Sequence, residues 1–73
     1  MNQIIFILII YFTNDPTSIT TSRAADVQEC HDFSKEAARQ IDQYNVAHPD
    51  HPVKQATAIC LDATEGKTVH YAL

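Results

Sequence analysis

The sequence predicts a small α+β protein, in which a four-stranded antiparallel sheet carries one helix packed on one face. Three observations predict this fold. The chain opens with an unbroken apolar run from Ile4 to Phe12, helical periodicity follows over residues 24–45, and apolar–polar alternation returns from Val53 onward. The 73 residues form a single domain, near the size at which one core is barely sufficient. A disulfide, a metal or a partner subunit commonly supplements so small a core.

The first predicted strand covers about residues 3–12. Isoleucine favours strands, and an apolar run of this length that ends in turn residues indicates a strand buried on both faces. Residues 14–16 (Asn-Asp-Pro) supply the turn. Two alternatives stay open for residues 1–25: a secretion signal cleaved at the Ala-Ala pair, residues 24–25, and a membrane anchor. The run is about half the roughly 20 apolar residues needed to span a bilayer, so membrane insertion is not expected.

The next segments predict an edge strand and then a helix. Residues 17–23 are rich in Thr and Ser and return beside the first strand. Over residues 24–45, one face of a helix collects residues spaced three or four apart. Pro49 and Pro52 end this helix. The residues of that face are Val27, Cys30, Ser34, Ala37, Ile41 and Tyr44.

Two further strands close the fold, over residues 53–63 and 68–73, joined by a turn at Gly66. In the first of them Ala56, Ala58 and Cys60 point to one face, which we expect to pack on the helix. Placing this strand beside the first gives the spatial order 2-1-3-4 in chain numbering, wholly antiparallel.

A single helix covers only one face of such a sheet. The uncovered face then carries one of the two alternating sets of the first strand, and an exposed apolar face of this kind marks an interface. A dimer through the sheet or a partner protein docked on it is the expected consequence. The predicted interface residues are Ile5, Ile7, Ile9, Tyr11, Ile59 and Leu61.

Cys30 and Cys60 lie on the two surfaces that are predicted to pack together, so a disulfide between them is the candidate bond. Closing a loop of about 30 residues stabilises a chain by roughly 3–4 kcal/mol in the chain-entropy model. The alternative is a pair of buried, reduced thiols. His48 and His51 are the candidate metal ligands, although a zinc site needs three or four converging ligands. No metal or other cofactor is therefore expected.

Charge and motifs exclude several function classes. The formal net charge of −4 argues against nucleic acid as the main partner, because phosphate binding needs a cationic patch. One glycine leaves no phosphate-binding loop, and no segment resembles a nucleophile elbow. No catalytic residue is predicted, and the chain is not expected to be an enzyme.

The segments "VQECHDFSKEAARQI" and "ATAICLDA", with the apolar first strand, resemble small proteins of bacteriophages and enterobacterial prophages. The resemblance implies a partner from the host, such as a defence or lysis component, that the protein binds and modulates or inhibits. We therefore expect a cytoplasmic, non-enzymatic interaction protein that forms a homodimer or docks on a host protein. The alternatives are an exported periplasmic protein stapled by its disulfide and a histidine-based metal-binding module.

Overall fold

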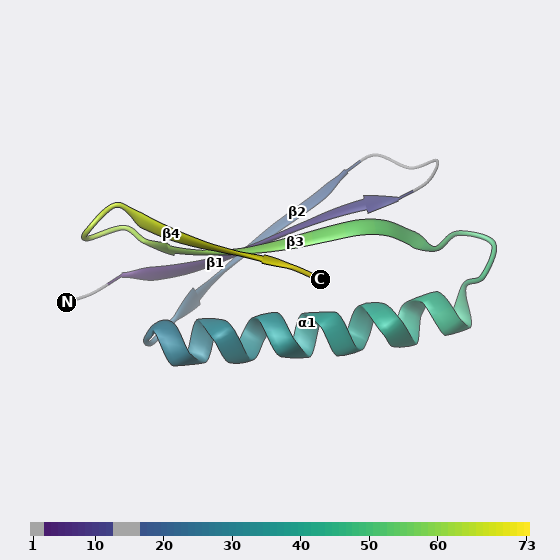
Figure 1. The fold of residues 1–73 in the computed structure, drawn as a ribbon, viewed down its shortest axis with the longest axis horizontal. Helices are drawn as coiled ribbons and strands as arrows, with labels where there is room; N and C mark the ends of the chain where they lie inside the picture. The colour runs from purple at the N-terminus through teal and green to yellow at the C-terminus, as the bar shows by residue number, and fades with distance from the viewer. Residues whose placement is uncertain (1–2, 13–16) are drawn as a thin grey trace.

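The structure, a computed structural model, describes residues 3–12 and 17–73. Its strands form one antiparallel sheet in the order β2-β1-β3-β4, and Figure 1 shows the helix α1 along one side of that sheet. The predicted fold class and strand order are thus confirmed. The turn predicted at residues 14–16 lies outside the described residues. The elements are β1 (Ile4–Phe12), β2 (Ser18–Ala24), α1 (Val27–Ala47), β3 (Val53–Asp62) and β4 (Lys67–Ala72).

Helix α1 begins at Val27, three residues later than predicted, because a cap at Asp26 sets its start. The Asp26 carboxylate accepts a hydrogen bond from the Glu29 N–H (2.8 Å), as an N-cap residue does. The Glu29 side chain in turn accepts from the Ala25 N–H (3.0 Å). Ala24 still belongs to β2, where it pairs with Ile4. The helix also extends two residues beyond the predicted end, to Ala47.

The core lies between α1 and the sheet and is built mainly from small side chains. Apart from Ile4 and Phe6, its buried hydrophobic residues are alanines and cysteines, which let the helix approach the sheet closely. Phe33 of α1 packs edge-on against Phe6, with ring centroids 5.7 Å apart. The buried hydrophobic residues are Ile4, Phe6, Ala24, Cys30, Ala37, Ala56, Ala58 and Cys60.

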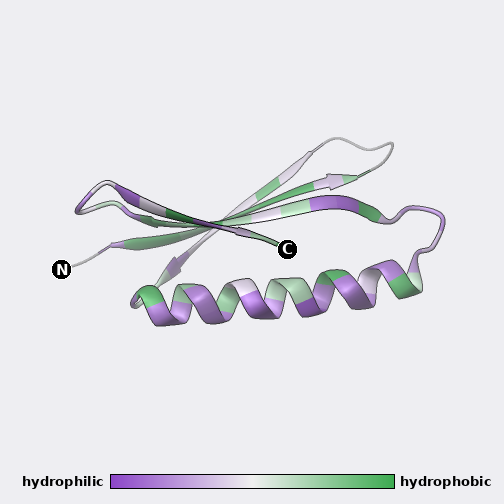
Figure 2. Cartoon of the chain, viewed as in Figure 1, coloured by the Kyte–Doolittle hydropathy of each residue, from purple (hydrophilic) through white to green (hydrophobic). Residues whose placement is uncertain are grey.

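Three residues of the predicted helix face do not join this core: Ile41 and Tyr44 are half-buried, and Val27 is exposed. Val27 is 53% exposed, because it is the first residue of α1 and lies only three residues after the end of β2. The buried face of α1 therefore runs from Cys30 through Ser34 to Ala37. Figure 2 shows the contrast between the mixed surface of the helix and the nearly continuous apolar colouring of β1.

The molecule is elongated, with extents of 43 × 20 × 16 Å. Its radius of gyration is 13.0 Å, against about 11 Å for a compact domain of this length. A single helix beneath a single sheet explains the shape, because neither layer is wrapped by further elements. One side of the sheet is consequently left without a covering layer in the described part of the chain (Figure 1).

Candidate interaction surface

The side of the sheet turned away from α1, called the open face below, carries the side chains that alternate with those of the core. In the strand register, Ile7 of β1 lies opposite Ile59 of β3. On the other flank of β1, Ile9 lies opposite Ile19 of β2. The apolar residues of the open face are Ile5, Ile7, Ile9, Tyr11, Ile19, Ile59 and Leu61.

All six residues predicted for an interface lie on this one face, and whether they contact a partner stays a prediction. The structure adds Ile19, which is 64% exposed at the margin of the face, next to Tyr11 at 42%. Ile19 was not predicted for the interface, because the Thr and Ser residues of segment 17–23 indicated a polar edge strand. Ile19 is the one large aliphatic side chain in that segment, and this was the signal that could have found it.

The open face carries little charge. An arginine and a histidine of this face stand on the edge strands: Arg23 lies opposite Ile5, and His70 lies opposite Ile59. Arg23 has no carboxylate within salt-bridge distance in the part of the chain that the structure describes. The described carboxylates lie elsewhere, on and beside α1, before β3, or at the end of β3 and the turn that follows it: Asp26, Glu29, Asp32, Glu36, Asp42, Asp50, Asp62 and Glu65.

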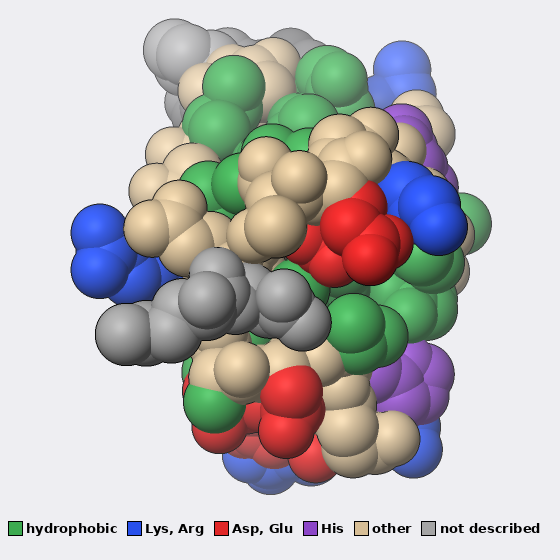
Figure 3. All heavy atoms as spheres, turned by 90° about the vertical axis from the view of Figure 1, so that its left-hand side faces the viewer, with side chains coloured by type: hydrophobic (Ala, Val, Ile, Leu, Met, Phe, Trp, Pro, Cys, Tyr) green, Lys and Arg blue, Asp and Glu red, His purple; other side chains and the backbone are tan. Residues whose placement is uncertain are grey.

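Figure 3 presents the end of the molecule at which β1 begins, with the open side of the sheet uppermost and the helix layer below. Hydrophobic and neutral side chains gather at the top of this view, whereas acidic side chains lie in its middle and lower parts. At this end of the molecule, the described carboxylates are therefore concentrated away from the uncovered apolar surface.

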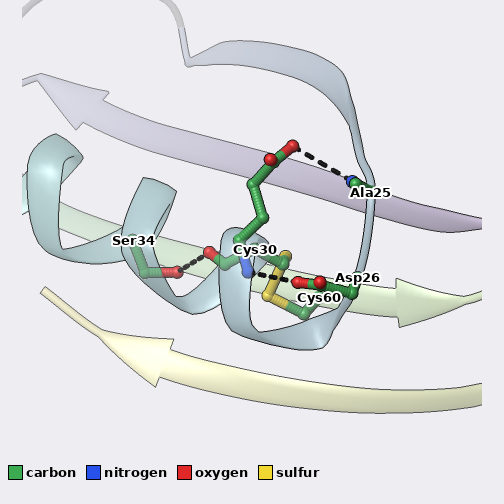
Figure 4. Close-up of a disulfide and its surroundings, with 6 residues drawn as sticks. Ala25, Asp26, Cys30, Ser34 and Cys60 are labelled. Atoms are coloured by element: carbon green, nitrogen blue, oxygen red, sulfur yellow. Dashed lines mark hydrogen bonds between the residues drawn. A yellow bond between two sulfur atoms is a disulfide. The ribbon is translucent and has the colours of Figure 1, made fainter.

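The predicted disulfide is present and joins Cys30 of α1 to Cys60 of β3 (Figure 4). The two Cα atoms are 6.1 Å apart, and the residues are 0% and 4% exposed. Beside the bridge, the Ser34 hydroxyl donates a hydrogen bond to the Cys30 carbonyl oxygen (3.1 Å). The bond lies on the core side, so it fixes the helix to the face of the sheet opposite the open face.

The two candidate metal ligands lie just beyond α1. The His48 ring stacks on Tyr44, with centroids 4.1 Å apart, and its Nδ1 lies 3.0 Å from the Tyr44 carbonyl oxygen. The His51 N–H donates to the His48 carbonyl oxygen (3.1 Å). Across residues 3–12 and 17–73, no three His, Cys, Asp or Glu side chains converge as a metal site requires.

Two surface hollows in the described residues are candidate sites, and neither holds a catalytic arrangement. One, of about 420 Å³, lies beside the start of β1 and the end of β2, where Thr21, Ser22 and Arg23 contribute its polar groups. The other, of about 210 Å³, lies between α1 and the sheet and is lined mainly by apolar side chains around Ile41 and Tyr44. Neither lining contains a nucleophile beside a general base.

No family model, curated protein or solved structure matches this chain. In residues 3–12 and 17–73, no helix is long and apolar enough to cross a membrane. The open face is therefore the candidate functional site, on the strength of its own chemistry.

Proposed function

We propose that this chain is a non-enzymatic protein-interaction module that uses the open face as its contact surface. One observation carries the proposal: six aliphatic side chains and a tyrosine lie on a face that no described element covers. Contiguous apolar patches of this kind on small proteins mark sites of protein association. The core, by contrast, is already complete without them.

The composition of the face defines the partner surface that would fit it. Its centre, around Ile7 and Ile59, suits aliphatic or aromatic side chains, and its margin offers a cation at Arg23 and polar groups on the edge strands. In keeping with the resemblance to phage and prophage proteins, we propose that the protein acts on a host protein and modulates or inhibits it. No cofactor is needed for such a role.

A pair of single substitutions tests the contact surface. Ile7→Glu places a charge at the centre of the open face, whereas Val46→Glu places the same charge on α1, where Val46 is 84% exposed. Each tagged variant is expressed in the native cells, and the complexes are crosslinked and weighed by mass spectrometry. We expect the wild type and Val46→Glu to carry the same partner at a fixed ratio and Ile7→Glu to lose it. Equal retention by all three proteins would contradict the proposal.

The Cys30–Cys60 disulfide favours a second candidate, an exported protein stapled by this bond. Disulfides persist in oxidising compartments, and a reducing cytoplasm would keep the pair as thiols. Cleavage near Ala25 would remove β1 and β2, including the buried Ile4 and Phe6, so this architecture supports a retained N-terminus. Intact mass of the native protein, with alkylation before and after reduction, tests both points. We expect an uncleaved chain, and a chain that begins near residue 25 would favour the exported form.

A further inference from the structure

We infer that the occupant of the open face is a second copy of this chain, which gives a symmetric dimer with two sheets inside and two helices outside. The inference rests on the proposed function, because it takes the open face as the contact surface. It goes further by naming the partner that the face fits. Three features of the described residues support it: the apolar side chains and the area of the face, the placement of charge, and the symmetry of the face.

The first feature is the distribution of apolar side chains. The open face carries larger side chains than the core face of β3, where Ala56, Ala58 and Cys60 are 2%, 0% and 4% exposed. Ile7 and Ile59, which lie opposite each other on the open face, are outside the buried core.

The area of the face suits a weak dimer. Four strands of nine, seven, ten and six residues, which rise about 3.3 Å per residue and stand about 4.8 Å apart, give a projected area of about 500 Å². Two such faces total about 1,000 Å², the area at which specific interfaces begin. We therefore expect a dimer that dissociates on dilution rather than an obligate one.

The second feature is the placement of charge. The carboxylates on α1 would lie on the two outer surfaces of a face-to-face dimer, separated by both sheets. Packed sheets stand about 10 Å apart, so the helix layers are further apart than the Debye length of about 8 Å at physiological salt. The carboxylates of α1 thus do not oppose this arrangement. A strongly basic partner would instead be drawn to the helix layer.

The third feature is the symmetry of the face. The two-fold axis of a face-to-face dimer lies in the plane of the interface, so groups near the centre of the face meet their own symmetry mates. Ile7 and Ile59 occupy that centre. Arg23 stands on an edge strand near one end of β1. For an axis that passes through the centre of the face and not through Arg23, the two guanidinium groups lie on different parts of the interface.

Sedimentation equilibrium of the purified, oxidised chain over about two decades of concentration tests the inference. We expect the wild type and Val46→Glu to change from monomer to dimer as concentration rises. Ile7→Glu and Ile7→Lys should each weaken the dimer by more than about tenfold in Kd, and an equimolar mixture of the two should restore it, because the opposite charges meet across the axis. Circular dichroism checks that each variant is folded. If either Ile7 variant fails to fold, Ile19→Glu replaces it, since the Ile19 side chain is 64% exposed.

A wild-type chain that stays monomeric throughout would overturn the inference, as would a dimer that both Ile7 variants leave intact. The proposed function has a separate readout, because the crosslinked complexes in native cells report a different partner. Loss of those complexes in Ile7→Glu from a monomeric wild type would reject the second copy and keep the contact surface. A dimer together with unchanged cellular complexes would support the second copy and reject the host contact at this face.

Discussion

The two faces of this sheet differ in how they are built, although they share the same strands. The core face of β3 is lined by alanine and cysteine, and α1 lies directly on it, joined by the Cys30–Cys60 bond. The open face is lined by isoleucine and leucine from the same strands. On β3, small residues thus lie under the helix and large ones lie where no described element covers them, whereas β1 carries large side chains on both faces.

This difference shows how a very small protein can divide its apolar residues. Close approach of helix and sheet needs small side chains, which bury little area each, so the core face gains stability from a covalent bond as well as from burial. The larger side chains of the open face are then left without a covering element in the described part of the chain. Four predictions test this division, from the largest effect to the smallest.

Loss of the disulfide should have the largest effect. In the double variant Cys30→Ala, Cys60→Ala, we expect the free energy of unfolding to fall by about 3–4 kcal/mol, since the bond closes a loop with a sequence separation of 30. A domain of this length has roughly 4–11 kcal/mol in total. Urea denaturation of the variant and of the reduced wild type should give matching values. A loss below about 1 kcal/mol in both would show that the core face needs no covalent link.

The same substitution on the two faces should give different results. Ala58→Val adds two methyl groups at a fully buried site under α1, and we expect a loss of about 1–3 kcal/mol from overpacking. Ala72→Val makes the same change on the open face, where Ala72 is exposed opposite Thr57, and should stay within about 0.5 kcal/mol. Denaturation of both variants measures this difference. Equal losses would mean that the two faces are equally crowded.

Loss of the N-cap of α1, the helix that covers the core face, should lower the free energy of unfolding by a smaller amount. Asp26→Ala removes the acceptor for the Glu29 N–H, and we expect a loss of about 1 kcal/mol by thermal or urea unfolding. Asp26→Asn keeps an acceptor oxygen and serves as the control, with most of the stability retained. An equal loss in both variants would assign the effect to charge at the helix start rather than to the hydrogen bond.

The exposed Glu36 side chain on the outer side of α1 should contribute least to stability. Hydrogen bonds from Arg39 and then Gln40 hold the pKa of Glu36 below its ordinary value of 4.5. A carboxyl with a lowered pKa adds stability above its unfolded pKa and loses it as pH falls through the lower folded pKa. This group is exposed and screened by solvent, so Glu36→Gln should leave the melting temperature at pH 7 unchanged within error. Melts of both proteins at pH 7 and pH 3 measure this, and a clear drop confined to pH 7 would contradict it.

Most of the fold could be predicted because its signals are local. The apolar run of β1 is bounded by polar segments, the helical spacing changes near Asp26, and Gly66 marks the last turn with a φ of +69°. Element ends could not be predicted as closely, because the start of α1 depends on the hydrogen bond that the Asp26 side chain accepts from the Glu29 N–H rather than on periodicity. The open face could be predicted because the sequence indicates one helix and one sheet, and one helix cannot cover both faces of a sheet.

The sequence by itself determined the elements, their order and the central place of β1. It left open which alternate residues of β1 face the helix, because a strand that is apolar at every position carries no period-two signal. Tertiary structure decided this through the register with β3, in which Phe6 pairs with Cys60 and Ile7 with Ile59. Once Cys60 is bonded to α1, Phe6 must lie on the core side and Ile7 on the open face, because neighbouring residues of a strand point to opposite sides.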